Sequence, residues 1–522
     1  QRRYPAWAQA ISGGGIAILY LSIYATFGFF KLLDPVPAFL LITLIVITSG
    51  VLALRYESLT IALIGILGAY ITPVLFGNDL EPDNSALVLV YVLIINLGLL
   101  FISTFRNWRW LTLIGLIASY TLFLLWAGND LFEPESTEHN LILAQTGLTS
   151  IFLVFVGATT LFHLIWKRTP RPLDLSLMLL NIAAYYFLTV YLLWDEYQSW
   201  FGLITLSLSI FYGLISLVAI KRPGASPLLT LYSLAVAMIL LTMAIPVQLK
   251  GTWITVAWSA EGIVLIWLGF VSRSWVIRRF ALVVLAGAAL RLIGFDTSTD
   301  LTEFQMFFNG RFATFSFTIL ALYLGAFIYR REKNSLEQWE GNIGLILIAV
   351  ANILTLWILS TEIMAYFDSR ALVNNEGTTY QEIENRSILA LTALWAIYAF
   401  GLLGIAFAKR SVVFRWAGLI LLLAPILKLM MIDTFVIELN PDTFKPVLNF
   451  YFVTYLVVLL STLLCAYLYK RRQEDLTERE RHVLTILIII ANLTSVWIFS
   501  TEVLRFFEFR EAKDVANFSN AK

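Results

Sequence analysis

Long apolar runs, each close to the length of a membrane-crossing helix and each bounded by a short polar segment, dominate this sequence. A helix needs about 20 apolar residues to cross the hydrocarbon layer of a membrane. The chain has 522 residues, of which 59% are hydrophobic and 14% are charged. Soluble domains carry about 25% charged residues, so this chain cannot hide its apolar surface in a water-soluble core. We therefore predict an all-α, polytopic integral membrane protein whose main contacts are membrane lipids.

The apolar runs predict about seventeen transmembrane helices, because each run is long enough for one crossing. They fall at 10–31, 36–54, 58–77, 85–104, 108–127, 142–166, 175–194, 199–220, 227–246, 252–271, 276–294, 311–330, 342–364, 386–408, 411–431, 447–469 and 480–504.

The connections between these spans alternate in charge. Basic residues occupy every second connection, as at Arg55, Lys167 and Lys470, whereas the connections between them are acidic. Positively charged loops are retained on the cytoplasmic side of a membrane. We therefore predict a cytoplasmic N-terminus and acidic loops on the opposite side. With an odd number of spans, the C-terminal end should be extracytoplasmic or the native protein should continue beyond it.

Internal repetition organises the C-terminal half. The segment 352–362 returns as 492–502, with asparagine, tryptophan, serine, threonine and glutamate at matching positions. This pattern predicts a tandem four-helix repeat, with repeat A at 252–372 and repeat B at 389–512 in the same membrane orientation. Matched pairs upstream share a second, slightly shorter spacing: Trp258 and Trp395, Arg291 and Lys428, Asp296 and Asp433, Thr297 and Thr434.

The first half shows a weaker duplication. The segment 63–70 resembles 113–120, and similar acidic loops follow both. We predict an N-terminal region of duplicated helix hairpins at 1–127 and a middle membrane region at 128–251.

Glu261 is the clearest candidate for a functional group inside the membrane. It lies in the middle of a predicted span, and the matching position of repeat B is Tyr398. Ionisable residues within a membrane are costly and often functional. A buried carboxyl there is a candidate proton carrier or a polar contact for cargo, and the alternative is a protonated or salt-bridged structural residue.

A basic residue, an aspartate and a glutamate recur in both repeats near the outer span ends. One interpretation is a pair of related polar sites that line an outward cavity. The other is interfacial salt bridges that hold each repeat together, with the basic side chains reaching toward water. The second interpretation predicts that Arg291 reaches Asp296 or Glu362, and that Lys428 reaches Asp433 or Glu502.

Other chemistry finds little support. Asp79, Glu81, Asp130 and Glu133 are weak candidate Ca²⁺ ligands, because their loops lack the spacing of an EF-hand. The single Cys465 and three scattered histidines exclude a thiolate cluster and a zinc motif. No nucleotide loop or catalytic motif occurs, so we expect no cofactor and lean against an enzyme. Basic and acidic residues nearly balance, at 36 and 35, and provide no bulk charge for nucleic acid.

Three segments, the glycine-rich stretch 2–21 and the stretches 62–73 and 257–262, carry a resemblance to a known family. They are similar to the bacterial predicted-membrane-protein family catalogued as Domain of Unknown Function 2339. The resemblance implies a location in the bacterial inner membrane. It also implies further helices and a coiled-coil segment before the first residue, and the opening Gln1 likewise suggests the interior of a longer protein. The family brings no established activity and no catalytic residues.

Three functions compete on this evidence. The leading hypothesis is transport or export of an amphiphilic envelope constituent, motivated by the repeats, Glu261 and the doubled outer polar groups. The second is a non-catalytic scaffold that assembles protein partners in the membrane. The third is a membrane enzyme that acts on a lipid-linked substrate at the outer face.

Overall fold

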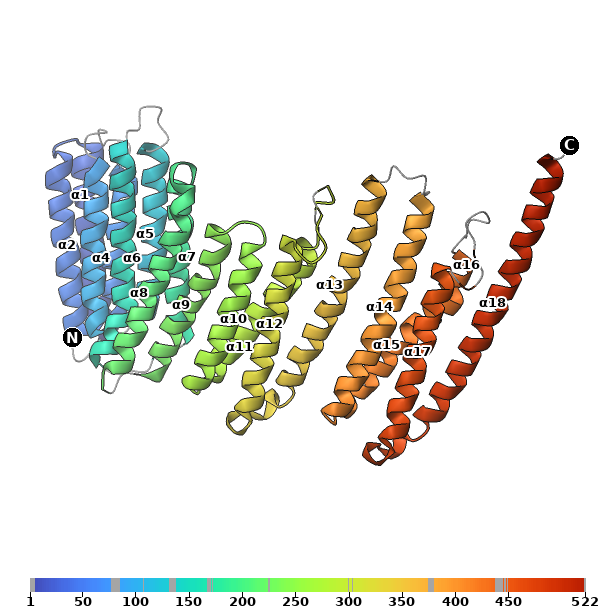
Figure 1. The fold of residues 1–522 in the computed structure, drawn as a ribbon. Coiled ribbons are helices and arrows are strands. Elements are labelled where there is room, and N and C mark those ends of the chain that lie inside the picture. The colour runs from blue at the N-terminus through green and yellow to red at the C-terminus, as the bar shows by residue number, and fades with distance from the viewer. Residues whose placement is uncertain are drawn as a thin grey trace. The chain divides into compact units, whose positions relative to one another are not determined.

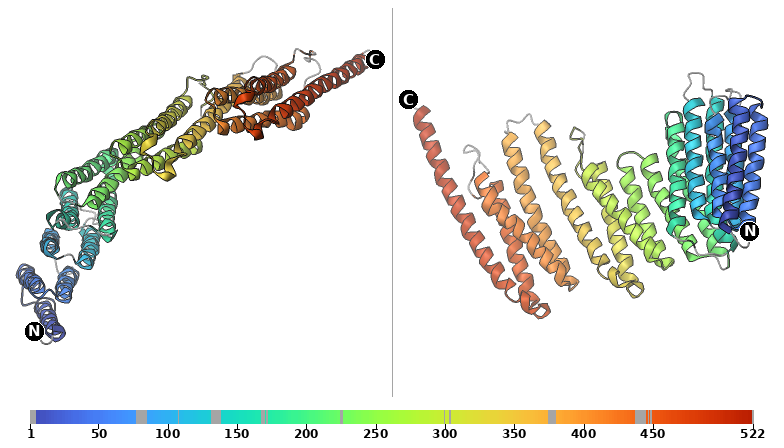
Figure 2. Two further views of the ribbon diagram at one scale, coloured as in Figure 1. Left: turned by 90° about the horizontal axis from the view of Figure 1, so that it is seen from below. Right: turned by 180° about the vertical axis from the view of Figure 1, so that it is seen from behind.

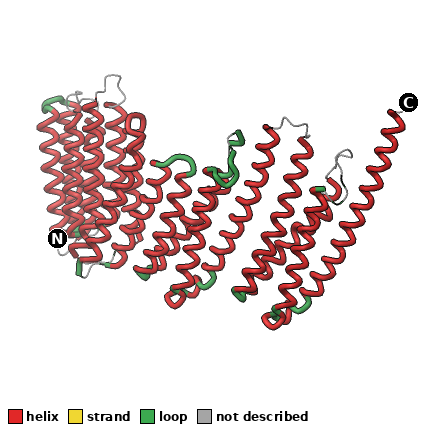
Figure 3. Tube along the Cα trace, viewed as in Figure 1, coloured by secondary structure: helices red, strands yellow, loops and turns green. Residues whose placement is uncertain are grey.

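The computed structural model is helical throughout the part of the chain that it describes (Figures 1 and 3). That part comprises residues 5–76, 85–106, 108–130, 138–166, 170, 172–223, 226–298, 300–302, 304–373, 380–436, 445, 447 and 449–520. No strand occurs among these residues, which confirms the all-α prediction for them. The chain divides into two compact units, Gln1–Leu249 and Lys250–Lys522.

The first unit is a bundle of helices that run side by side (Figure 1). Its helices are α1 (Pro5–Tyr24), prolonged by a π-helical turn (Ala25–Phe29), α2 (Pro35–Tyr56), α3 (Leu59–Phe76), α4 (Ser85–Phe105), α5 (Arg109–Asp130), α6 (Glu138–Trp166), α7 (Pro172–Tyr197), α8 (Phe201–Lys221) and α9 (Pro227–Gln248).

The second unit is a row with α18 at one end, in which α10 packs against both α11 and α12, and α14 packs against α13, α15 and α17 (Figure 2). Its helices are α10 (Trp253–Val271), α11 (Trp275–Phe295), α12 (Gly310–Arg331), α13 (Ile343–Val373), α14 (Tyr380–Ala408), α15 (Val412–Lys428), the short α16 (Thr434–Val436), α17 (Phe450–Arg471) and α18 (Val483–Asn520). We call the end of this unit that carries Arg273, Arg330, Lys409 and Lys470 the basic end, and the opposite end the acidic end.

Fourteen helical stretches in the described residues are long and apolar enough to cross a membrane. One stretch, Pro172–Lys221, covers both α7 and α8. Two further helices fall outside this set: α3 is counted among the shorter apolar helices, and α11 carries three arginines. A multi-pass membrane protein is therefore confirmed, whereas the number of about seventeen crossings stays a prediction.

The outward faces of these helices are apolar, as contact with lipid requires. Leu290, Phe327 and Phe499 are 72%, 61% and 61% exposed, and large apolar side chains are exposed along both units. A surface of this kind would aggregate in water. It is stable only where lipid tails cover it.

Helix boundaries in the second unit recur at the spacing that relates 352–362 to 492–502. α12 and α17 begin and end at corresponding residues, and α18 begins at the residue that corresponds to the start of α13. The short 3₁₀ turns between them, Lys333–Ser335 and Gln473–Asp475, have the same separation. The prediction of two repeats rests on sequence, and these boundaries agree with it in register.

Glycines allow the first two helices of each repeat to pack closely, and the two copies offer examples on different helices. A Cβ on Gly262 of α10 would lie 2.5 Å from Leu285 of α11. In the second copy a Cβ on Gly418 of α15 would lie 2.7 Å from Leu403 of α14. Small residues let membrane helices approach closely, and both pairs of helices use glycine for this purpose.

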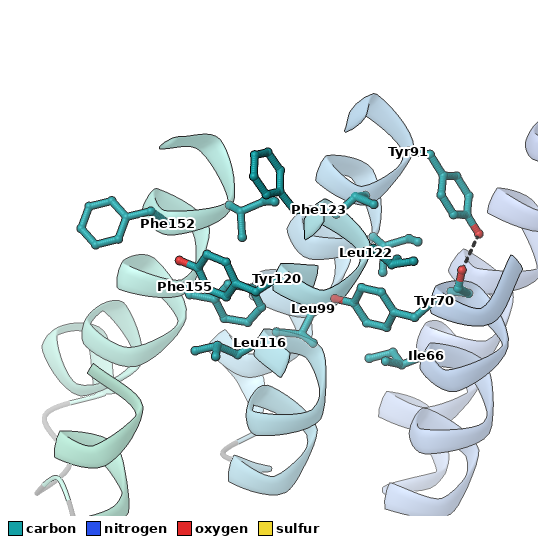
Figure 4. Close-up of a cluster of buried hydrophobic side chains, with 14 of the residues drawn as sticks. Ile66, Tyr70, Tyr91, Leu99, Leu116, Tyr120, Leu122, Phe123, Phe152 and Phe155 are labelled. Carbon is teal, nitrogen blue, oxygen red and sulfur yellow. Dashed lines mark hydrogen bonds between the residues drawn. The ribbon is translucent and has the colours of Figure 1, made fainter. Parts of the chain in front are cut away.

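The core of the first unit contains tyrosines whose hydroxyl groups bond within the bundle (Figure 4). Tyr70 donates to Asn96 Oδ1 at 2.5 Å, and Ser119 donates to the same oxygen at 2.8 Å. Tyr120 donates to Asn181 Oδ1 at 2.8 Å. In hydrocarbon, such hydroxyl groups require partners on neighbouring helices, so these bonds link α3, α4, α5 and α7.

The glycine contact can be tested with two matched substitutions. Gly262→Ala forces its new methyl group against Leu285, so we expect a loss of about 1–3 kcal/mol in the free energy of unfolding. Gly287→Ala, on α11, meets nothing within 4 Å and should be neutral or stabilising, because alanine favours helix by about 1 kcal/mol. Unfolding of both variants in the same detergent measures the difference, and equal stabilities would contradict the close-packing argument.

Candidate functional site

At the acidic end of repeat A, a basic residue, an aspartate and a threonine form one closed cluster. Arg291 Nη1 lies 2.8 Å from both carboxylate oxygens of Asp296 and donates to Thr255 Oγ1 at 2.9 Å. The Thr255 hydroxyl donates in turn to Asp296. Asp296 is 6% exposed, so its charge is neutralised by Arg291 within the fold.

Repeat B builds the same cluster with lysine in place of arginine. Lys428 Nζ lies 2.7 Å from Asp433 Oδ1 and donates to Thr392 Oγ1 at 2.6 Å. Thr392 donates to Asp433 Oδ2 at 2.8 Å. Thr255 and Thr392 have the same separation in sequence as the other matched pairs of this region. The predicted ion pairs of Arg291 with Asp296 and Lys428 with Asp433 are confirmed.

The two glutamates of the predicted clusters have other partners. Glu362 is fully buried and binds Arg311, with Nη2 2.7 Å from its Oε1. Its Oε2 accepts from the backbone N–H of Phe307 at 3.0 Å and from Asn309 Nδ2 at 2.9 Å. The partner of Glu362 is therefore Arg311 of α12 rather than Arg291 of α11, and sequence reasoning missed it.

Glu502 occupies the matching position with the same two neutral donors. Its Oε1 accepts from the backbone N–H of Val447 at 2.9 Å and from Asn449 Nδ2 at 2.8 Å. The residue that corresponds to Arg311 is Tyr451, so the cation of the first copy is missing from α17.

In both copies, an arginine guanidinium group nevertheless donates to an equivalent backbone carbonyl group. Arg311 donates to the carbonyl of Thr297 at 3.1 Å, and Arg505 of α18 donates to the carbonyl of Thr434 at 3.1 Å. Arg505 also lies over the ring of Tyr451, 3.7 Å from its centroid. The two copies thus supply one cation to equivalent carbonyl groups from different helices, a compensation that is visible in sequence only when Ala365 is aligned with Arg505.

A second duplicated ion pair lies at the basic end and was not predicted. Arg278 forms a bidentate pair with Glu340, with distances of 2.6 and 2.7 Å. Arg415 lies 2.8 Å from Glu480 in the second copy. Both glutamates are fully buried, and each also caps the 3₁₀ turn that precedes the last helix of its repeat. The repeat spacing relates these residues too, but the arginines look like ordinary cytoplasmic charges in sequence.

Glu261 is buried on α10, with 9% exposure, as its place in the sequence suggested. Ser259, two residues earlier and on another side of α10, lies 3.0 Å from the hydroxyl of Thr318 on α12. Tyr398, at the matching position of repeat B, is bonded to Asn352 of α13 through Oδ1 at 2.9 Å. The two copies therefore use this mid-membrane position differently.

The side chains of the candidate metal ligands fall outside the part of the chain that the structure describes. Asp79, Glu81 and Glu133 lie outside the described residues, and the side chain of Asp130 is not described either. Among the residues that are described, no group of three or more histidine, cysteine, aspartate or glutamate side chains is positioned to hold a metal ion.

Among its described residues, the first unit also contains a buried charged group. Arg109 of α5 lies 2.8 Å from Asp174 of α7, and His163 of α6 lies 3.3 Å from the other carboxylate oxygen. Asp174 and His163 are 4% and 2% exposed. The group ties three helix ends together, which matches the role of the ion pairs in the second unit.

Comparison with known proteins supports the assignment to a family. The model of the family described as "Predicted membrane protein (DUF2339)" matches residues 1–296 and 297–439, so the chain belongs to this family. No curated protein and no solved structure matches the chain.

The basic-end pair yields a stability prediction. Arg415→Met leaves Glu480 buried without its cation, and we expect a loss of about 3–5 kcal/mol in the free energy of unfolding. The exposed pair of Arg331 and Glu332 provides the control, because Arg331→Met should cost less than about 1 kcal/mol. Chemical unfolding in one detergent compares them, and similar losses for both variants would refute a structural role for the buried pair.

The exchanged arginine yields a second prediction. Arg311→Tyr removes the cation beside Glu362 and should cost about 3 kcal/mol. Adding Ala365→Arg recreates the arrangement of Tyr451 and Arg505, and we expect this double variant to regain more than half of the loss. Ala365→Arg alone should destabilise the protein, because it places a second cation close to Arg311. A double variant no more stable than Arg311→Tyr would show that the two copies are not interchangeable here.

Proposed function

We propose that this member of the family is a non-catalytic scaffold of the bacterial inner membrane, whose helical row holds partner helices. The observation that carries the proposal is the closure of the acidic-end clusters. Asp433 and Glu362 are both fully buried, and each is bonded within its own repeat. Carboxylates used in this way join helices and leave no open charged site for a solute or a reaction.

The same geometry argues against chemistry at the outer face. An enzyme acting on a lipid-linked substrate would need Asp296 or Asp433 directed toward the substrate. Each aspartate instead accepts hydrogen bonds from a cation and a threonine of its own repeat. A proton donor or nucleophile needs access that these contacts remove.

Helix-to-helix docking is the interaction that the second unit displays most clearly. α13 closes repeat A and α14 opens repeat B, and side-chain hydrogen bonds join the two helices. Trp395 Nε1 donates to Ser360 Oγ at 3.0 Å, and the Tyr398 hydroxyl donates to Asn352 Oδ1 at 2.9 Å. Polar bonds between apolar helices are a principal source of specific association in membranes. A protein built from such junctions is suited to adding further helices at its sides.

Transport or export of an amphiphilic envelope constituent is the second candidate. Two observations favour it: the buried Glu261, and an apolar groove of about 290 Å³ between α15 and the start of α18. Trp416 and His482 line the groove together with aliphatic side chains, a lining that suits an acyl chain. Glu261 is not among the residues that line this groove, which is why we rank transport below the scaffold.

The two functions predict opposite results in one pair of measurements. For the scaffold, polymer-bounded discs cut from native membranes should contain the chain in particles of one defined mass, larger than the purified chain in equal discs. Glu261→Gln should leave that mass unchanged, because a scaffold needs no titratable carboxyl at this position. Vesicles that contain the purified chain should move a fluorescent phospholipid across the bilayer no faster than vesicles without protein.

Particles that hold the chain alone would overturn the scaffold. Phospholipid movement that requires the chain and is abolished by Glu261→Gln would overturn it as well, and would establish the second candidate. The charge-neutral substitution matters, because glutamine keeps the shape of the side chain and removes only its titration.

A further inference from the structure

The outer side of α18 repeats the surface by which α13 holds α14. At the spacing that relates 352–362 to 492–502, Asn492 corresponds to Asn352 and Ser500 corresponds to Ser360. On α13 these two side chains accept hydrogen bonds from Tyr398 and Trp395. The same pair of acceptors therefore stands eight residues apart on both helices, on one face of each.

The surroundings of the two helices differ. Asn352 and Ser360 are partly covered, whereas Asn492 and Ser500 are exposed. Val496 and Val503 lie on the same face of α18 and are 67% and 54% exposed. Their counterparts on α13, Leu356 and Ile363, are partly covered. We call Asn492, Val496, Ser500 and Val503 the α18 stripe.

The side chain of Asn492 makes the same hydrogen bond to its own helix as the side chain of Asn352, which binds Tyr398. Its Nδ2 donates to the carbonyl of Ile488 at 2.9 Å, just as Asn352 Nδ2 donates to Ile348 at 2.8 Å. In Asn352 this bond leaves Oδ1 directed at Tyr398. Within the described residues, Oδ1 of Asn492 accepts no hydrogen bond.

The depth of Asn492 makes this exposure significant. It lies nine residues after the first residue of α18, which is about 14 Å along a helix that rises about 1.5 Å per residue. That is close to the middle of a hydrocarbon layer about 30 Å thick. A carboxamide oxygen that faces lipid at this depth finds no hydrogen-bond donor, so a donor from another helix would stabilise it.

We propose that the α18 stripe docks a transmembrane helix of a partner protein that presents tryptophan and tyrosine three residues apart, in the manner of α14. The tyrosine hydroxyl donates to Asn492 Oδ1, and the indole N–H donates to Ser500 Oγ. The partner helix runs antiparallel to α18, as α14 runs antiparallel to α13 across their short connection. This proposal rests on the scaffold function and identifies the surface and the partner that the scaffold uses.

The probe for the test is a synthetic peptide with the sequence of residues 380–408, added to the full chain in lipid nanodiscs. Photo-leucine replaces Leu391 and Leu402 of the peptide, one turn outside the Trp395 and Tyr398 positions on the same face. Illumination should join the peptide to residues 492–503 of α18, as read by mass spectrometry. A peptide with Trp395→Phe and Tyr398→Phe keeps the aromatic shape and lacks both donors.

The hydrogen bonds should appear as coupled losses of affinity. Asn492→Leu or Ser500→Ala in the chain should each weaken peptide binding roughly 3- to 30-fold, the range expected for one interhelical bond. Asn492→Leu should cost nothing further when the peptide already carries Tyr398→Phe, because both changes remove the same bond. Leu493→Ala should leave the affinity unchanged, because its counterpart on α13, Ile353, is 63% exposed and is therefore not covered by α14.

Two results would overturn the proposal: equal binding by the peptide without donors, or crosslinks confined to other helices or to lipid. Further outcomes distinguish a failure of the α18 stripe as the docking site from a failure of the scaffold function. If native particles keep their mass when the chain carries Asn492→Leu and Ser500→Ala, the scaffold function stands and the α18 stripe is not its site. If the peptide docks but native particles hold the chain alone, the scaffold function fails instead.

Discussion

Hydrocarbon offers no hydrogen-bond partner to a buried carboxylate, and five buried acids of the second unit each pair with a cation from within the fold: Asp296, Glu340, Glu362, Asp433 and Glu480. In the second unit this pairing sets where the charges lie. Arg291 and Lys428 serve the aspartates at the acidic end, and Arg278 serves Glu340 at the basic end. The pairs lie at opposite ends of the helices, and the span between them is held mainly by apolar packing, with a few hydrogen bonds such as that between Ser259 and Thr318. Ion pairs therefore join the helices of each repeat at both ends, and the outward faces of these helices are apolar and suited to contact with lipid.

The two repeats show how this requirement is met when sequence changes. The cation that reaches the Thr297 carbonyl comes from Arg311, whereas the matching Thr434 carbonyl is reached by Arg505 of another helix. The glycines that allow close approach of the first two helices differ as well: Gly262 on the first helix faces Leu285 in repeat A, whereas Gly418 on the second helix faces Leu403 in repeat B. In both cases the second repeat keeps the same kind of contact, but a residue at a different position provides it. A substitution at one position is tolerated because a neighbouring helix can supply the missing charge or the missing space.

These exchanges explain which parts of the structure the sequence reveals. The helices are predictable, because a run of about 20 apolar residues has few other stable forms. The aspartate pairs are predictable as well, because Arg291 and Asp296 are close in sequence and recur as Lys428 and Asp433. The partner of Glu362 is not, since Arg311 is far from it in sequence and becomes Tyr451 in the second copy, so repetition points away from it. The bond between Arg278 and Glu340 is unpredictable for a different reason. Arg278 lies near a loop that is predicted to be cytoplasmic, and the positive-inside rule alone accounts for a basic residue there.

Mid-membrane polar residues are where the two copies diverge most, and lateral neighbours account for the divergence that the structure describes. Asn352 and Asn492 occupy equivalent positions and make the same bond to their own helix. Only Asn352 has a neighbouring helix, α14, which brings Tyr398 to its oxygen. A polar group retained at the centre of a lipid-facing helix is costly unless something binds it. The recurrence of this group on α18 is therefore better explained by docking than by the internal needs of repeat B, whose ends are already fastened by Lys428 with Asp433 and by Arg415 with Glu480.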